Sequence, residues 1–167
     1  MIIIAAGSNL PFQGVDSEGV VLNAFFALER ANIKTRLSPL YKTPAWPDPS
    51  DPPFVNAVAL AETSLSPEAL LAALHGVEAG FGRRRDLERN APRTLDLDLI
   101  AYHAERRPAP GEAAVGGLIL PHPRLQDREF VLAPLCDLAP DWRHPVLGRT
   151  AQTMLDALET RGARRIG

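Results

Sequence analysis

The chain has 167 residues, 46% of them hydrophobic, which suits one ordinary domain with a sizeable core, and we expect a single domain over residues 1–167. Its net charge of −2 excludes the positive field that collects nucleic acid or anionic membranes, so any phosphate must be bound locally. Cys136 is the only cysteine, which excludes an internal disulfide. The opening apolar run is too short for a signal peptide or a membrane helix. We therefore expect a soluble, cytoplasmic monomer that binds neither nucleic acid nor membrane.

The first half of the chain predicts a strand, a helix and two more extended segments. Residues 2–6 form an apolar run that ends in the turn Gly7-Ser8-Asn9. Asp16 or Ser17 then caps a helix whose buried stripe is Val21, Leu22, Phe25 and Leu28. Residues 33–41 are expected to be extended. They lead into TPAWPDPSDPP, where five prolines in eleven residues favour an open loop, before a strand at 54–62.

The second half predicts another helix and strand, followed by further helices. Ser66-Pro67-Glu68 is a typical helix start, residues Leu70, Leu74, Val77 and Phe81 form its apolar stripe, and Gly80 and Gly82 mark its end. A strand follows in LDLDLI, and two apolar segments, 130–138 and 150–158, are expected to be helical. The basic residues 161, 164 and 165 are expected to lie in a solvated tail.

This order of elements predicts an α+β, ferredoxin-like fold. It comprises two β-α-β units that form an antiparallel sheet, with helices on one face and additional C-terminal helices. We expect the opposite face of the sheet to be open and roofed by loops.

Two aspartates share one face of the strand in PRTLDLDLI. Leu95, Leu97 and Leu99 recur with a period of two and face the core, so Asp96 and Asp98 lie on the other face. Like charges two residues apart repel, so either cations neutralise them or that face is solvated. Taken alone, the pattern is no more than a solvated strand face with salt bridges.

A local concentration of arginine precedes these aspartates in GRRRDLERNAPR. Guanidinium groups match phosphate oxygens bidentately, and paired carboxylates suit Mg²⁺ that also binds substrate phosphates. Two such ions would lie roughly 3.5 to 4 Å apart. Neither a P-loop nor a G-x-G-x-x-G fingerprint is present, so scattered side chains must hold any nucleotide.

The motifs APRTLDLDLI, upstream GRRR, AAGSNL, YKTPAW, FVNAV and LPHPRLQDREFVLAPL occur in an order that resembles the 6-hydroxymethyl-7,8-dihydropterin pyrophosphokinase family. The resemblance runs from the first strand to about Pro140. It implies transfer of the terminal two phosphates of ATP, the co-substrate, to the hydroxymethyl group of a reduced pterin, with release of AMP. This is a step of folate biosynthesis.

The resemblance also implies roles for individual residues. Asp96 and Asp98 would bind two Mg²⁺ ions, Arg83 and Arg93 would be catalytic, and either Asp98 or a water would accept the hydroxyl proton. The remaining nucleotide contacts would come from His75, Glu78, Arg85, Arg89, His122 and Arg128, with Arg93 among them.

The pterin would be held by aromatic stacking and by an amide that both donates and accepts hydrogen bonds. The resemblance assigns these roles to Phe130 and Asn56, with Phe54 nearby and backbone contacts from Thr43 and Pro44. The chain departs from the family at two positions. Asn90 stands where many relatives have tryptophan, so that roof over the pterin is either missing or supplied from elsewhere, with Trp46 as a candidate. Gly117 stands where some relatives have a basic residue, which would remove one phosphate contact.

Two other functions remain open from the residues themselves. A metal-dependent phosphohydrolase could use the same aspartates, although the Asn56, Phe130 and proline-loop constellation argues against it. A nucleic-acid-binding module on this fold would carry aromatic and basic residues across its strands, where this chain has aspartates. His103 and His144 have no partner at metal-ligand spacing, and we expect them to be exposed to solvent.

Overall fold

A computed structural model of the chain describes residues 1–46, 48–83, 92–108, 118–159 and 162–166. Its centre is a six-stranded antiparallel sheet with the order β5-β1-β4-β3-β6, in which β2 also pairs with β4. The strands are β1 (Ile2–Ser8), β2 (Lys34–Leu37), β3 (Leu40–Thr43), β4 (Phe54–Glu62), β5 (Asp96–Tyr102) and β6 (Arg164–Ile166). No helix in these described ranges is long and apolar enough to cross a membrane.

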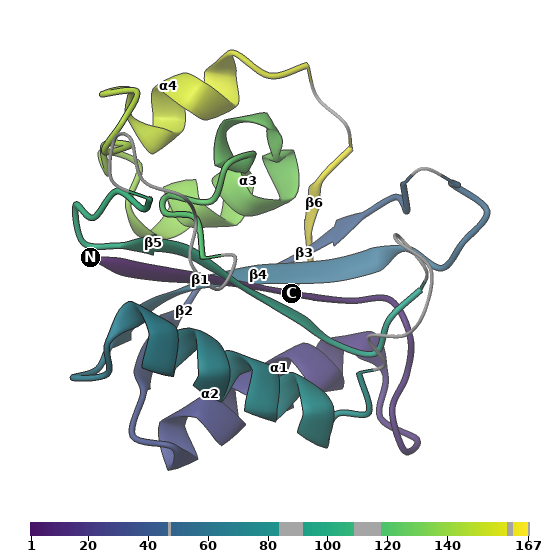
Figure 1. The fold of residues 1–167 in the computed structure, drawn as a ribbon. Helices are drawn as coiled ribbons and strands as arrows, with labels where there is room; N and C mark the ends of the chain where they lie inside the picture. The colour runs from purple at the N-terminus through teal and green to yellow at the C-terminus, as the bar shows by residue number, and fades with distance from the viewer. Residues whose placement is uncertain (47, 84–91, 109–117, 160–161, 167) are drawn as a thin grey trace.

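Helices lie on both faces of the sheet (Figure 1). The helices α1 (Ser17–Arg30) and α2 (Pro67–Gly80) pack on one face, over the buried side chains of Ile2, Ile4 and Leu97. The helices α3 (Glu129–Leu138) and α4 (Ala151–Asp156) cover part of the other face. A short 3₁₀ helix, η2 (Leu125–Asp127), leads into α3.

The helix starts follow the capping residues predicted from the sequence. The side chain of Asp16 accepts a hydrogen bond from the Gly19 amide at 2.9 Å, and the Ser66 hydroxyl accepts one from the Ala69 amide at 3.2 Å. Both caps satisfy amides that have no partner within the helix. The predicted stripe of α1 is also confirmed, except at Leu22, which is exposed.

The predicted fold class is confirmed, but the expectation that loops alone would roof the second face is wrong. Ile3, Ala5, Val58 and Ile100 project from this face and form a second core with α3 and α4. Their apolar surface must be buried, and the C-terminal helices bury it. Only the part of the face beyond this core is left for a site.

The predicted solvated tail is also corrected in part. Arg164 and Arg165 are exposed, yet they belong to β6, which pairs with β3 over Leu40–Lys42. The Ala163 amide donates to Glu129 Oε2 at 3.4 Å, which links this segment to the start of α3. The segment therefore completes the sheet on the β3 side.

Candidate active site

The register of the sheet places the predicted functional side chains in one row. Gly7 of β1 pairs with Asp96 of β5 on one side and with Asn56 of β4 on the other, so all three project from the α3 side of the sheet. Asp98 follows two residues along the same face. Leu97 is buried on the opposite face, as the alternation predicted.

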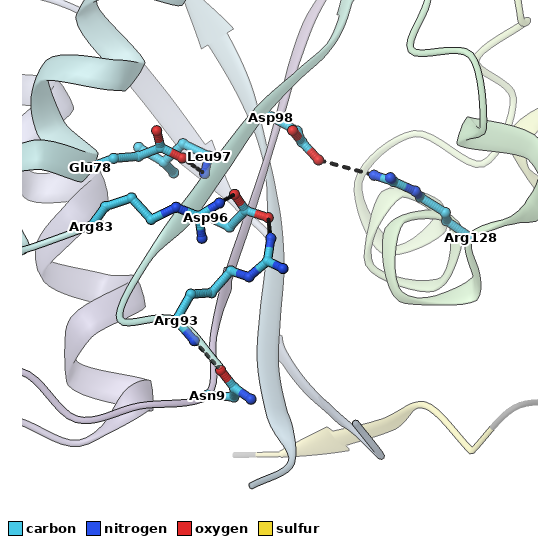
Figure 2. A network of polar contacts seen from close by, with 8 residues as sticks. All are labelled: Asn9, Glu78, Arg83, Arg93, Asp96, Leu97, Asp98 and Arg128. Carbon is cyan, nitrogen blue, oxygen red and sulfur yellow. Dashed lines mark hydrogen bonds and ion pairs between the residues drawn. The ribbon is translucent and has the colours of Figure 1, made fainter. Parts of the chain in front are cut away.

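Two arginines hold Asp96 in a double ion pair (Figure 2). Nη2 of Arg83, just beyond α2, lies 3.1 Å from Oδ1 of Asp96. Nη1 of Arg93, at the approach to β5, lies 2.8 Å from Oδ2 of the same carboxylate. Each oxygen of the Asp96 carboxylate is thus paired with one arginine. The fold brings together three side chains from residues 83 to 96.

Asp98 has a separate partner on the other side of the site. Nη1 of Arg128 lies 3.0 Å from Oδ2 of Asp98, and the same guanidinium lies 5.5 Å from the centroid of the Phe130 ring. This geometry is a cation–π contact. Each aspartate is therefore neutralised by arginine. This confirms the first of the two alternatives from the sequence, in which cations neutralise the pair.

Glu78 lies beneath the strand that carries both aspartates. Its side chain is 2% exposed, and Oε1 accepts a hydrogen bond from the Leu97 amide at 2.8 Å. The amide lies between Asp96 and Asp98, so Glu78 anchors the outer edge of β5 at the site. The resemblance assigned Glu78 to nucleotide binding. Its burial and this hydrogen bond also make it a support for β5, a role that strand and helix periodicity does not reveal, and its contact with nucleotide stays a prediction.

A pocket of about 240 Å³ opens beside Asp98. It is lined by Leu71, Asp98, Leu99, Leu118, Ile119, His122 and Pro123. Burial and the nearby Arg128 charge lower the pKa of His122, against the opposing effect of Asp98. Its Nδ1 accepts from the Arg124 amide at 3.2 Å, so the neutral ring carries its proton on Nε2. His75 lies half-buried on α2, one turn before Glu78.

The predicted pterin residues lie on the β1 to β3 side of the row. Asn56 is 4% exposed, and its Nδ2 donates to Oγ1 of Thr43 at 3.0 Å, which orients the amide. A Cβ at Gly7 would lie 3.1 Å from Asn56 Oδ1 and 3.7 Å from the Phe54 ring. Glycine thus leaves a flat floor between Asp96 and Asn56, and Phe130 is partly exposed on the Arg128 side.

The residues present fit a divalent cation shared with a ligand. In the described ranges, no cluster of three His, Cys, Asp or Glu side chains could hold a metal alone. Two half-exposed carboxylates on one face supply the few oxygen ligands that Mg²⁺ takes when phosphates and water complete its shell. The arginines that now neutralise these carboxylates would then be available to phosphate oxygens.

Several predicted residues lie outside the described part of the chain. These are Arg85, Arg89 and the two departures from the family pattern, Asn90 and Gly117. Trp46, the alternative roof, is described and is 72% exposed on the proline-rich loop. Its part in covering a pterin remains a prediction.

One structural residue of the site was missed by the motif analysis. Asn9, read from the sequence only as part of a turn, is buried and accepts a hydrogen bond from the Arg93 amide at 2.7 Å. The available signal was its place in the AAGSNL motif directly after the first strand, and the structure shows its role, because a buried amide must find partners.

Comparison with known proteins identifies the family. The family model of 7,8-dihydro-6-hydroxymethylpterin-pyrophosphokinase (HPPK) matches residues 3–140. The chain is 39% identical to 2-amino-4-hydroxy-6-hydroxymethyldihydropteridine pyrophosphokinase of Pseudomonas aeruginosa, over 99% of this chain and 96% of the relative. It is 38% identical to the Haemophilus influenzae protein of the same name, over 83% and 81%.

A solved structure supports the fold independently. Plasmodium falciparum HPPK-DHPS aligns with a TM-score of 0.65 over 93% of this chain and 43% of that chain, at 13% identity. At this identity the likeness concerns the fold alone. The family model and the two bacterial relatives establish the rest: the chain belongs to the 7,8-dihydro-6-hydroxymethylpterin-pyrophosphokinase family, and it transfers a pyrophosphoryl group from ATP to hydroxymethyldihydropterin in folate biosynthesis.

Proposed function

We propose that the row of side chains on β5, β1 and β4 carries out this transfer, with nucleotide at the β5 end and pterin at the β4 end. The observation that supports this arrangement most strongly is the convergence of three arginines, from three different segments, on Asp96 and Asp98. Carboxylates bind a cation and arginines bind phosphate oxygens, so one cluster serves both parts of a metal-bound polyphosphate.

Asp96 and Asp98 would hold two Mg²⁺ ions. When bound, the ions would neutralise phosphate charge and orient the oxygens of the in-line displacement. With Asp96 holding a cation, Arg83 and Arg93 would be free to donate to phosphate oxygens. The structure supports this change of partner because both guanidinium groups already lie within 3.1 Å of one carboxylate at the site.

The nucleotide base would occupy the pocket beside Asp98. Its volume of about 240 Å³ lies below the roughly 300 to 1,000 Å³ of pockets that enclose a whole drug-sized ligand, and so suits a flat base with the sugar and phosphates outside. Neutral His122 presents an Nε2 proton there. Arg128 contacts Asp98, which lines this pocket, and lies over the Phe130 ring, so it would contact nucleotide on one side and border the pterin on the other.

The pterin would lie over Gly7, between Asn56 and Phe130. The Asn56 amide is held by Thr43 in a fixed orientation, which suits the donor and acceptor edge of the heterocycle. The hydroxymethyl oxygen then attacks the β-phosphorus and bonds to it, while the bond from the β-phosphorus to the oxygen bridging it to the α-phosphorus breaks and that oxygen leaves with AMP. The hydroxyl proton passes to water or to Asp98. We also propose a cytoplasmic monomer with one domain; a single six-stranded sheet with helices packed on both faces supports the single domain.

Product analysis tests this function. Purified protein is incubated with ATP, Mg²⁺ and 6-hydroxymethyl-7,8-dihydropterin, and the nucleotides are separated. We expect AMP and pyrophosphorylated pterin in equal amounts, and no consumption of ATP without pterin. ADP or free phosphate as the main product would contradict the proposal and would favour the phosphohydrolase. Removal of Mg²⁺ with a chelator should stop AMP formation, and added Mg²⁺ should restore it.

A further inference from the structure

Three segments of the site meet at one buried side chain, that of Asn9. The Arg93 amide donates to Asn9 Oδ1 at 2.7 Å, and Asn9 Nδ2 donates to the Pro52 carbonyl at 3.1 Å. Pro52 belongs to the proline loop, residues 44–53, while Arg93 leads into β5. One amide at the end of β1 therefore joins both.

The orientation of this amide follows from the chemistry of its partners. A backbone N–H can only donate and a carbonyl can only accept, so the oxygen of Asn9 must face Arg93 and its nitrogen must face Pro52. Asn9 is 3% exposed, which leaves water little access to either group. Loss of the side chain would leave the Arg93 amide without its Asn9 acceptor, which is unfavourable for a buried donor.

The backbone at Asn9 adds to the same connection. The amides of Asn9 and Leu10 both donate to the Arg93 carbonyl, at 3.1 and 3.2 Å. Both polar groups of the Arg93 peptide backbone are thus held by residues 9 and 10. The Arg93 side chain, which reaches Asp96, extends from this restrained backbone (Figure 2).

We infer that Asn9 is a positioning residue that sets the placement of Arg93 relative to the proline loop. The inference rests on the proposed function, in which Arg93 contacts the transferred group and the two ends of the proline loop, at Thr43-Pro44 and Phe54, contact the pterin. In-line transfer requires both substrates to be aligned, and a misplacement of about 1 Å can cost 100-fold in rate. Asn9 touches neither substrate and acts through the backbone of Arg93 and Pro52.

The inference predicts different kinetic effects for two substitutions. Asn9→Ala removes both hydrogen bonds, so it should lower kcat roughly 10- to 100-fold and raise the KM for pterin. Asn9→Asp at pH 8 keeps an oxygen for the Arg93 amide but sets an oxygen against the Pro52 carbonyl. It should keep kcat within about threefold of wild type, yet raise the pterin KM about fivefold, the equivalent of one net hydrogen bond.

Ser38→Ala is the matched structural control. Ser38 is also buried and also bridges two segments, since its hydroxyl donates to the Pro39 carbonyl at 2.8 Å and accepts from the Val58 amide at 3.1 Å. It lies on the far side of β4 from β5. This variant should lose thermal stability while kcat and pterin KM stay at wild-type values.

Hydrogen exchange at the Arg93 amide supplies a readout that does not depend on activity. Exchange should accelerate in Asn9→Ala and stay slow in Asn9→Asp. The inference is overturned if the Arg93 amide stays protected in Asn9→Ala, if both variants lose kcat equally, or if Ser38→Ala loses as much activity at equal destabilisation. Arg93→Ala separates this failure from failure of the proposed function: if it keeps normal turnover, the role of Arg93 is wrong. If it is inactive while Asn9→Ala has normal kcat, the role of Asn9 is wrong.

Discussion

At the scale of single residues, the site is a set of ion pairs that a substrate can exchange. Asp96 bonds to Arg83 and Arg93, and Asp98 bonds to Arg128. Partly exposed pairs of this kind contribute about 1 kcal/mol or less to stability, because solvent screens them. Their value lies in placing opposite charges in advance at the positions where a cation and phosphates would bind.

Replacement of Asp96 or Asp98 by asparagine should abolish metal-dependent turnover while the fold remains. Even residues that only orient a metal ligand affect metal affinity or activity by about 10- to 100-fold, so each ligand substitution should cost at least about 100-fold. The melting temperature should change little, because the carboxylates are partly exposed. AMP formation and thermal denaturation measure the two effects. Near-normal turnover in either variant would show that these side chains only complete ion pairs on the strand face.

At the scale of elements, the turn between α3 and α4 contains a buried histidine that the sequence analysis expected to be exposed. His144 is 5% exposed, and its Nδ1 accepts from the amides of Val146 and Leu147 at 3.2 Å each. Burial lowers its pKa below the usual value of 6.5. The neutral ring is therefore part of the folded turn. The expectation of exposure is wrong because the amides of Val146 and Leu147 need an acceptor, which the ring supplies.

This histidine should make the protein less stable in mild acid. Well above pH 6.5 the ring is neutral in both folded and unfolded chains. As the pH falls below 6.5, the unfolded chain binds the proton first, so the free energy of unfolding decreases until the pH passes the lowered folded pKa.

His144→Asn tests this effect, because its amide oxygen can replace Nδ1 as acceptor but cannot be protonated in this range. It should be less stable than wild type at pH 7.5, because it loses the edge contact with Trp142, whose ring centroid lies 6.0 Å from that of His144. Its loss of stability between pH 7 and pH 5 should nevertheless be smaller than that of wild type. Urea unfolding at both pH values measures the difference, and an unchanged pH dependence would exclude His144 as its source.

At the scale of the whole molecule, β6 links the sheet to the part of the site assigned to pterin. It pairs with β3, which ends at Thr43, and a Cβ added at Gly162 would lie 3.7 Å from the Pro44 ring. The Ala163 amide also reaches Glu129, the residue before Phe130. Residues 162–166 thus contact both segments that flank the proposed pterin position (Figure 1).

Deletion of residues 162–167 should lower both stability and pterin affinity. The edge of β3 loses its partner strand, and Ile166 no longer packs against the core on the α1 and α2 side, so we expect a loss of about 1 to 3 kcal/mol in the free energy of unfolding. The KM for pterin should rise more than the KM for ATP. Ile166→Ala is the control that retains the strand pairing, and it should lose stability with a smaller change in pterin KM. Equal KM values for the deletion and wild type would show that β6 serves stability alone.

The class of fold, the face of the aspartates and the family could all be predicted from the amino-acid sequence. Helix caps and the alternation in LDLDLI depend on neighbours along the chain, so their physics is local, whereas the family followed from the resemblance of motifs spread along the chain. Features that depend on contacts between distant segments appear only in the folded chain. They include the pairing of each arginine with its carboxylate and the burial of Glu78 under Leu97. The bridge from Asn9 to Arg93 and Pro52, and the packing of α3 and α4 on the second face, belong to the same class. Strand register and helix packing set these contacts, because they determine which partner lies close enough to form a hydrogen bond with each buried polar group.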